Sequence, residues 1–514
     1  MEPLMVFGAA ILVWMIAAGF DVFEFVHSLT HDFEVYELDE LVLLIFLIGN
    51  AGYYYAYRSE AKKNREILLR ASAEDELDWL SKHDSLTGLP NRRFLQELLN
   101  EKAESDPSSI GTGLGVLSID LDGFKKANDL LGHSGGDAVL MEVSERLKSY
   151  DGIDVAVRQG GDEFLALVDR AKGRDPMDVA EEVRAILCEP VTCDGVTHII
   201  GASIGISYYP EDNSDLAKVV QYADLAMYEI KRLKDQSVVR FEPYMDEASH
   251  ERAKMETDLL TAMNAGEIRP HYQPLVNLET NAIYGFEALA RWTRPGYGPV
   301  SPEAFVRVAE DMGVITKLSD DLLRMACLDA KAWPDELILS FNLSPVQLTD
   351  PLLGLRITKI LDSVDFPPRR LEVEITESAL VQDFDRAADI LAQLRSIGVK
   401  LSLDDFGTGY SNLSQLSKLD FDRLKVDQSF IRNFQSEPKQ MAIVKTVLSL
   451  GNSLGLYTTA EGIENQEQLK VLQELGCGCG QGYLLGRPVD AAATLEMISG
   501  MGHGDLVSVQ KLAG

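Results

Sequence analysis

Residues 400–411 contain the side chains that a metal-dependent phosphoesterase site requires. Apolar and polar residues alternate over 399–403, which predicts a strand, and the strand is followed directly by Asp404, Asp405 and a glycine-rich loop. Two adjacent carboxylates can hold two different metal ions, or bridge one ion and orient the other. The same short pattern is also typical of an Asx turn that closes a strand. The surrounding sequence has to decide between these two interpretations.

Polar residues recur at the ends of predicted strands throughout the second half of the chain. Strand and helix patterns alternate over about 255–500, which indicates a parallel barrel or a wound sheet. The strands end at Glu287, Asn342, Glu374, Asp404, Lys425, Glu461 and Gln481. A ring of acids at the carboxyl edge of the strands is where a TIM barrel carries its active site, and core packing does not explain these positions. The metal-site interpretation is therefore favoured.

This half resembles an EAL domain, the cyclic di-GMP phosphodiesterase family, along nearly its whole length. The matching blocks are Tyr272-Gln-Pro274, Glu287-Ala-Leu-Ala-Arg291, Asn342-Leu-Ser-Pro345, Glu374-Ile-Thr-Glu377, Asp404-Asp405-Phe-Gly-Thr-Gly-Tyr-Ser411, Lys425-Val-Asp427, Ala460-Glu461-Gly-Ile-Glu464 and Gln481-Gly-Tyr-Leu484. The resemblance implies an α/β TIM-barrel-like fold that hydrolyses cyclic di-GMP to linear pGpG by two-metal catalysis.

The resemblance also assigns roles, and none of the expected EAL side chains is substituted. One Mg²⁺ or Mn²⁺ would be bound by Glu287, Asn342, Glu374 and Asp404, and a second by Asp404, Asp405 and Glu461. Lys425 would position or deprotonate the attacking water, and the substrate-binding set would be Gln273, Arg291, Glu377, Glu464 and Gln481, with Glu377 holding the 405–411 loop. Because clustered carboxylates repel one another, we expect a metal-free site to be loose or partly protonated.

Residues 83–242 show a second pattern, a strand ending in Asp120 and Asp122 and a hairpin with a Gly-Gly-Asp-Glu turn at 160–163. Glycines at a hairpin tip let backbone amides approach phosphates, and the carboxylates can bind a cation and take a proton. The region resembles a GGDEF domain of the diguanylate cyclase family, an α+β cyclase-like (palm-type) fold. Further matching blocks begin at Asp84, Asp120 and Ala202.

By this resemblance the GGDEF site would bind GTP with one or two Mg²⁺ or Mn²⁺ ions. The implied residues are Asp120, Asp162 and the Leu121 carbonyl for metal, Asn128 and Asp137 for guanine, Lys125, Lys231, Gly160 and Gly161 for phosphates, and Glu163 for activation of the 3′-hydroxyl. Two departures stand out. Asp235 replaces a phosphate-gripping Arg, which weakens the expected grip on GTP, and Asp151-Gly-Ile-Asp154 lacks the Arg of the product-inhibition site.

The charge of the chain restricts its partners. Lys and Arg number 48 against 81 Asp and Glu, which gives a net charge of −33 and a pI near 4.6. That field repels polyanions, so we expect no nucleic-acid partner, and a small phosphorylated ligand needs bound cations. The 5 cysteines are scattered, as in a protein with reduced thiols.

The N-terminal region predicts a membrane anchor. The runs at about 4–20 and 41–57 lack charged residues, so 1–57 is expected to form two transmembrane helices with a short extracytoplasmic loop. Arg58, Lys62, Lys63 and Arg65 follow the second run, which places the catalytic domains in the cytoplasm at a bacterial inner membrane. His27 and His31 in the acidic loop could bind a metal or sense pH, or belong to a solvated turn.

The remaining segments are linkers. Residues 58–82 predict a helix with an apolar stripe at Leu69, Ala73, Leu77 and Leu80, which could pair with a second copy or pack on the next domain. We expect a homodimer. Residues 243–254 predict a polar connector to the EAL domain at 255–500, and 501–514 a C-terminal tail.

Three functional hypotheses follow. The chain is a phosphodiesterase whose GGDEF domain binds GTP as a regulator, a bifunctional enzyme that also condenses two GTP into cyclic di-GMP, or a non-catalytic nucleotide receptor. The intact turn at 160–163 favours the second hypothesis and Asp235 opposes it, while the presence of Glu287 and Lys425 opposes the third.

Overall fold

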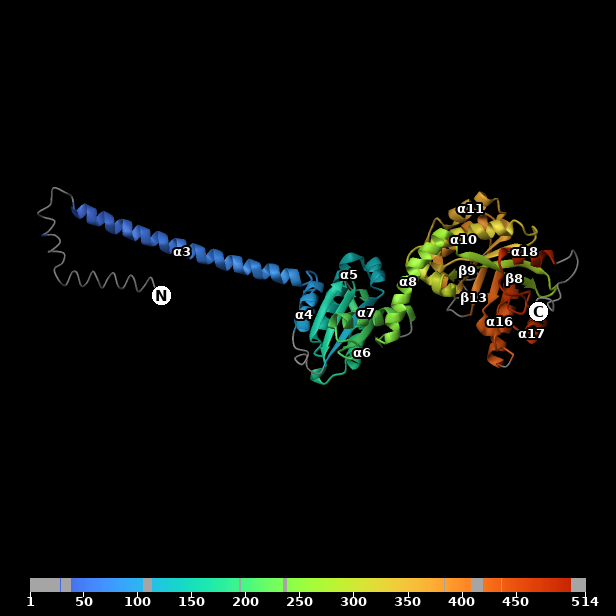
Figure 1. The fold of residues 1–514 in the computed structure, drawn as a ribbon, viewed down its shortest axis with the longest axis horizontal. Helices are drawn as coiled ribbons and strands as arrows, with labels where there is room; N and C mark the ends of the chain where they lie inside the picture. The colour runs from blue at the N-terminus through green and yellow to red at the C-terminus, as the bar shows by residue number, and fades with distance from the viewer. Residues whose placement is uncertain are drawn as a thin grey trace. The chain divides into compact units, whose positions relative to one another are not determined.

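The computed structural model describes residues 28, 38–104, 113–193, 196–233, 238–382, 384–407, 419–435 and 437–500. The chain divides into two compact units, Met1–Asp246 and Glu247–Gly514, which are considered separately (Figure 1). The second unit begins within helix α8 (Pro243–Ala265), which runs through the predicted connector at 243–254.

The N-terminal helix corrects the predicted membrane anchor. α3 (Leu38–Lys82) is one helix of 45 residues, and in the described part of the chain no helix has both the length and the apolar character needed to cross a membrane. The prediction of two transmembrane helices is therefore wrong. The apolar run in 41–57 ends at Ile48, after which glycines, an asparagine and tyrosines lead into the charges at Arg58. The other predicted span, 4–20, and the histidine loop lie outside the described residues.

The first unit contains a five-stranded sheet in the order β2-β3-β1-β6-β7. Neighbouring strands are antiparallel except β6 and β7, which are parallel. The strands are β1 (Leu114–Asp122), β2 (Val155–Gly160), β3 (Glu163–Asp169), β6 (Gly201–Tyr209) and β7 (Val238–Arg240), and a separate hairpin is formed by β4 (Val191–Cys193) and β5 (Val196–His198). The helices are α4 (Arg92–Glu104), α5 (Phe124–Ser149), η3 (Arg170–Lys172), α6 (Pro176–Leu187) and α7 (Leu216–Leu233).

Alternation along β1 decides which side chains reach the site. Leu117, Ile119 and Leu121 pack into the core beneath α5 and α6, whereas Leu114 and Val116 pack into the core beneath α4 and α7. Because side chains alternate between the faces of a strand, the next residues of the second set, Ser118 and Asp120, face α7. The polar end of β1 is thereby directed at a helix that carries its partners.

The second unit is a closed barrel, as predicted for the EAL half. Its sheet has the order β10-β9-β11-β12-β13-β14-β15-β16-β8, and an additional pairing of β8 with β9 closes it. The strands are β8 (Arg269–Asn277), β9 (Ile283–Arg294), β10 (Gly298–Val300), β11 (Ile338–Asn342), β12 (Leu371–Thr376), β13 (Lys400–Phe406), β14 (Arg423–Val426), β15 (Tyr457–Ala460) and β16 (Cys479–Gly480). Strand β8 is antiparallel to both of its neighbours, and a short turn joins it to β9. Strand β10 is also antiparallel to β9, whereas β9 and β11–β16 pair with one another in parallel.

Helices surround the barrel strands (Figure 1). After α8 they are α9 (Pro302–Asp311), α10 (Ile315–Ala330), η4 (Pro345–Thr349), α11 (Leu353–Val364), η5 (Pro368–Arg370), α12 (Glu377–Gln382), α13 (Phe384–Ser396), α15 (Gln428–Ile431), α16 (Pro438–Leu454), α17 (Gln466–Glu474) and α18 (Ala491–Ser499). One large apolar cluster joins them to the outer face of the strands. The carboxyl ends of the parallel strands consequently meet at one edge of the barrel.

The contact between β6 and α7 gives a stability prediction. A Cβ atom on Gly205 would lie 2.1 Å from both the Ala223 carbonyl oxygen and the Met227 backbone nitrogen. Gly205→Ala should therefore force the helix away from the sheet and lower the free energy of unfolding of the first unit by about 3 kcal/mol. Thermal and urea unfolding measure the change.

Gly478→Ala in the second unit is the matched control. The nearest described atom to a Cβ there is the Thr458 carbonyl oxygen at 3.6 Å, an ordinary contact. Equal effects of the two substitutions would contradict the close packing of α7 on β6.

Candidate functional site

The centre of the barrel site is the ammonium of Lys425, on β14. Its Nζ lies 2.6 Å from Glu374 Oε2 and Glu461 Oε1, and 3.6 Å from Glu287 Oε2 and Asp404 Oδ1. The side chain is only 1% exposed. Burial lowers the pKa of Lys425, but the four carboxylates outweigh burial and hold the pKa well above its usual range. Lys425 is therefore a fixed positive charge among four acids.

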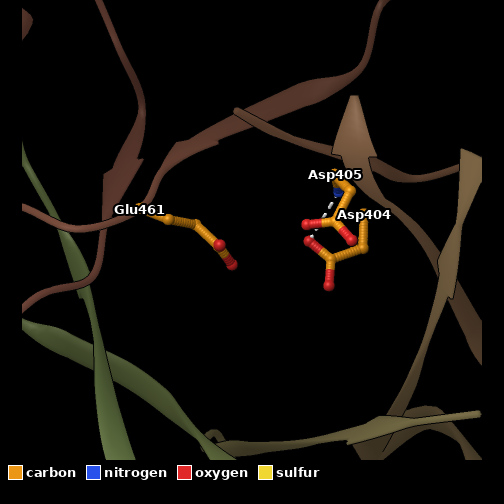
Figure 2. A group of neighbouring side chains, drawn as sticks. All are labelled: Asp404, Asp405 and Glu461. Carbon is orange, nitrogen blue, oxygen red and sulfur yellow. Dashed lines mark hydrogen bonds between the residues drawn. The ribbon is translucent and has the colours of Figure 1, made fainter. Parts of the chain in front are cut away.

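Asp404, Asp405 and Glu461 converge on one point (Figure 2). One oxygen of each carboxylate lies within 4.8 Å of the others. Adjacent residues of a regular strand point to opposite faces, but Asp405 has a φ of 55° and the pairing of β13 with β14 shifts register at this point. This local distortion brings both aspartates to the same side of the strand.

Burial and mutual repulsion favour the protonated forms of three of the acids. Burial, followed by the charge of Asp404, raises the pKa of Asp405 to about 6. Burial also raises the pKa of Glu461 to about 8, although Lys425 opposes the shift. The pKa of Glu374 lies well above its usual range for the same reason, with the charge of Glu287 adding to burial. These shifts agree with the expected partial protonation of a metal-free site.

Amide side chains hold Glu287 in its charged form. Asn342 Nδ2 donates to Glu287 Oε1 and Gln481 Nε2 to Oε2, each at 2.6 Å. Gln481 Nε2 also donates to Gln273 Oε1 at 3.0 Å, and Gln273 Nε2 to the Gly486 carbonyl at 3.0 Å. Burial raises the pKa of Glu287, but Lys425 and the two amides outweigh it, so the pKa lies below its usual range. Since Asn342 donates through nitrogen, its amide oxygen remains for a cation.

The residues fit divalent metal ions. Carboxylate and amide oxygens are the ligands that Mg²⁺ and Mn²⁺ prefer. The structure gathers Asp404, Asp405 and Glu461 into one group of possible ligands. It places the members of the other predicted set around Lys425: Glu287, Glu374 and Asp404 contact its ammonium, and Asn342 contacts Glu287.

A cavity of about 340 Å³ opens beside these acids. Seven predicted residues line it: Gln273, Glu287, Asn342, Asp404, Glu461, Glu464 and Gln481. Leu289, Gln428, Arg432, Gly462, Gly482 and Tyr483 also line it and were not predicted. Tyr483 lies inside the matched Gln481 block, so the sequence signal was present. Arg432 follows the short helix α15 and carries no motif that would identify it.

Two predicted substrate residues lie outside this cavity lining. Arg291 is half-buried and its Nη1 donates to the Ala290 carbonyl at 2.8 Å. Glu377 Oε2 accepts a hydrogen bond from Gly407 N at 3.0 Å, at the start of the loop it was expected to hold. The rest of that loop, 408–411, lies outside the described residues, as do residues 412–418.

The GGDEF unit brings a smaller set of predicted residues together. Lys231 Nζ on α7 lies 2.7 Å from Asp120 Oδ2, and Asp120 is opposite Glu163 in the β1–β3 register. The Asp162 carbonyl accepts from Leu121 N at 3.3 Å. Burial raises the pKa of Asp120 although Lys231 opposes it, and burial and the charge of Asp120 raise the pKa of Glu163.

Arg158, which was not predicted, fixes the glycine turn of this unit. Its Nη2 and Nε donate to the Gly161 carbonyl at 2.8 and 3.1 Å, and its Nη1 binds Asp84 Oδ1 at 2.7 Å. Gly160 and Gly161 have φ values of 153° and 54°, which favour glycine. The two hydrogen bonds from Arg158 to the Gly161 carbonyl hold the glycine turn at 160–163 in this conformation.

The other predicted GTP residues lie on α5. Lys125 and Asp137 are exposed and Asn128 is half-buried. The Asn128 Oδ1 atom lies against Gly136, across a kink at Gly132. Asp235 lies outside the described residues.

Comparison with known protein families supports the two domain resemblances drawn from the sequence. Residues 256–488 match the EAL domain, and residues 81–237 match the diguanylate cyclase GGDEF domain. The chain belongs to the tandem GGDEF–EAL family. Within this family it is 35% identical to the cyclic di-GMP phosphodiesterase NbdA of Pseudomonas aeruginosa over 83% of this chain and 55% of that protein.

Two further relatives carry informative names. The bifunctional diguanylate cyclase/cyclic di-GMP phosphodiesterase MucR of Pseudomonas aeruginosa is 36% identical over 86% of this chain and 65% of its own length. The solved PaMucR phosphodiesterase in complex with c-di-GMP is 36% identical, with a TM-score of 0.46, over 47% of this chain and 99% of that one. This GGDEF–EAL chain thus spans less than two thirds of the length of NbdA and MucR.

The raised carboxyl pKa values predict how stability depends on pH. Without divalent metal, Asp405 and Glu461 bind more protons in the folded than in the unfolded state, since their folded pKa values are about 6 and about 8. Their stabilising contribution is complete below about pH 4 and is lost as pH rises through those values. The free energy of unfolding of the EAL unit should fall by roughly 3 kcal/mol between about pH 5 and pH 7, most of it from Glu461 because Asp405 is partly exposed.

Urea unfolding with a chelator present measures this dependence. Asp405→Asn removes one of the titrating groups and should make the dependence weaker, and saturating Mg²⁺ should flatten it because metal ligands bind as carboxylates. A pH dependence that neither change alters would show that other groups titrate.

Proposed function

We propose that this GGDEF–EAL chain is a cyclic di-GMP phosphodiesterase that opens its substrate to linear pGpG at the barrel site. The observation that carries the proposal is the meeting of Glu287, Glu374, Asp404 and Glu461 around Lys425 at the carboxyl edge of the barrel. The printed names of NbdA and MucR support the substrate class.

Metal ions have a defined place in this proposal. Asp404 would take part in both sites, with Glu287, Asn342 and Glu374 completing one and Asp405 and Glu461 the other. Two bound divalent cations would activate the attacking water and offset the charge that builds on the phosphate. Lys425 remains protonated while it keeps its carboxylate contacts, so it acts as a hydrogen-bond donor that positions water or phosphate.

Substitution of the shared carboxylate tests the proposal. Asp404→Asn preserves the shape of the side chain and removes the charge that both metal sites use, so hydrolysis of cyclic di-GMP should fall by more than about 100-fold. Chromatographic separation of cyclic di-GMP and pGpG measures the rate, and circular dichroism checks the fold. Asp420→Asn, at an exposed position outside the site, is the control. Undiminished turnover in Asp404→Asn would exclude the metal assignment.

We infer that the GGDEF unit binds GTP with a divalent cation and regulates the barrel. Its turn is held by Arg158, and Asp120 and Lys231 lie together next to Glu163. A bifunctional enzyme is the second candidate, favoured by this intact turn and by the printed name of MucR. Cyclic di-GMP formation from GTP would distinguish the second candidate, and a change of phosphodiesterase rate on addition of GTP would support the first.

A homodimer is part of the same proposal. Leu77 and Leu80 on α3 are exposed and could pair with the same stripe of a second copy. Condensation of two GTP molecules would require two GGDEF units facing each other.

GTP binding can be measured without turnover. Asp120→Asn should lower the affinity for Mg²⁺-GTP by at least about tenfold, because the carboxylate is the buried metal-ligand candidate of this unit. Isothermal calorimetry with a non-hydrolysable GTP analogue gives the affinity. Asp151→Asn, exposed before the start of β2, removes an equal charge and should leave the affinity unchanged. A similar loss in both variants would indicate a general charge effect.

A further inference from the structure

Two buried serines occupy matching positions in the barrel but differ in their hydrogen bonds. Ser340 on β11 precedes Asn342 by two residues, and Ser402 on β13 precedes Asp404 by two residues. Both serines are fully buried, with 0% exposure. Ser340 Oγ donates to Glu374 Oε1 at 2.6 Å, whereas Ser402 Oγ has no hydrogen-bond partner among the described residues.

The hydrogen bond from Ser340 distinguishes the two oxygens of Glu374. Glu374 is only 1% exposed, and its Oε2 lies 2.6 Å from Lys425 Nζ. Glu374 pairs in register with Asn342, so Ser340 reaches it diagonally from the neighbouring strand. A buried carboxylate oxygen without a donor is costly, which favours keeping the Ser340 bond whatever cation approaches Oε2.

We propose that Ser340 is a positioning residue that fixes the orientation of the Glu374 carboxylate, with Oε1 held by the hydroxyl and Oε2 turned to the acids around Lys425. The inference rests on the proposed two-metal function of the barrel. Side chains that hydrogen-bond to metal ligands fix the orientation of those ligands, and their loss weakens metal binding by about 10- to 100-fold. Ser402 has the same burial and the same position in its strand but makes no such bond within the described part of the chain. The role assigned to Ser340 therefore depends on its hydrogen bond to Glu374 and not on burial or position.

A carboxylate held in one orientation should favour Mg²⁺ over Ca²⁺. Mg²⁺ requires near-ideal octahedral geometry, whereas Ca²⁺ accepts carboxylates through one oxygen or two in flexible geometry. Without the Ser340 hydroxyl, Glu374 could turn and offer both oxygens. Loss of the hydroxyl should therefore weaken Mg²⁺ binding and spare Ca²⁺ binding, an effect that simple loss of packing would not produce.

The experiment compares Ser340→Ala with Ser402→Ala in the full chain. Each is made in an Asp120→Asn background so that the GGDEF unit contributes little metal binding. Isothermal calorimetry with MgCl₂ or CaCl₂ alone gives both affinities without substrate. We expect Ser340→Ala to lower the Mg²⁺ affinity ~10-fold with the Ca²⁺ affinity unchanged or higher, and Ser402→Ala to change neither. Saturating Mg²⁺ should restore most of kcat for cyclic di-GMP in Ser340→Ala.

The possible failures are distinguishable. If the Asp120→Asn background binds Mg²⁺ but the two serine variants respond equally, or if Ser340→Ala lowers both affinities in parallel, the positioning role is overturned and the proposed function stands. If the background binds no divalent cation and hydrolyses no cyclic di-GMP, the proposed function fails and the inference fails with it. Thermal unfolding of the metal-free variants confirms that each is folded.

Discussion

The EAL barrel depends on the balance between one buried ammonium and the acids around it. Four carboxylates surround Lys425, so full ionisation would leave three uncompensated negative charges in a region of low dielectric. Such repulsion costs several kcal/mol unless protons or cations offset it. Burial and the neighbouring charges raise the pKa values of Glu374 and Glu461, which favours protonation of these acids when no cation is bound. The same imbalance makes the site attractive to divalent cations.

A second ion pair, between Arg423 and Glu372, lies on β14 and β12, the strands that carry Lys425 and Glu374. In this pair the positive and negative charges are equal in number. Arg423 precedes Lys425 on β14, and Glu372 precedes Glu374 on β12. Arg423 Nε lies 3.0 and 3.1 Å from the two oxygens of Glu372, and Arg423 Nη1 donates to Thr459 Oγ1 at 3.0 Å. This pair has one charge of each sign and needs no ligand. The layer with excess negative charge, at the carboxyl edge, is therefore the layer built to bind something.

Much of this arrangement could be predicted from the sequence, because it follows from the alternation of apolar and polar residues and from the positions of polar residues at strand ends. Alternation predicted the strands, and the polar residue at the end of each strand predicted an acidic edge. The convergence of Asp404 and Asp405 could not be predicted, because it needs the positive φ of Asp405 and a register shift between β13 and β14. The antiparallel pairing of β16 with β8 is likewise long-range, and local patterns do not specify it.

The predicted membrane anchor failed for a different reason. Residues 41–57 lack charge, as a membrane span does, yet the second half of that run consists of glycine, asparagine, alanine and tyrosine. Lack of charge is weaker evidence than sustained hydropathy over the full length of a span. Arg432 and Arg158 were missed because each acts through three-dimensional proximity, and no short motif marks an arginine that lines a cavity or holds a turn carbonyl.

The two units use lysine in different ways. Among the described residues Lys231 pairs with Asp120, and its side chain is 41% exposed, so it can move into solvent and leave Asp120 to a metal ion. Lys425 is 1% exposed and contacts four carboxylates. Its ammonium could reach solvent only by leaving these carboxylates, which would leave buried charges unpaired. A cation entering the barrel must therefore share the acids with Lys425. The ligand of the barrel has to accommodate a fixed ammonium, whereas the ligand of the GGDEF unit can displace a mobile one.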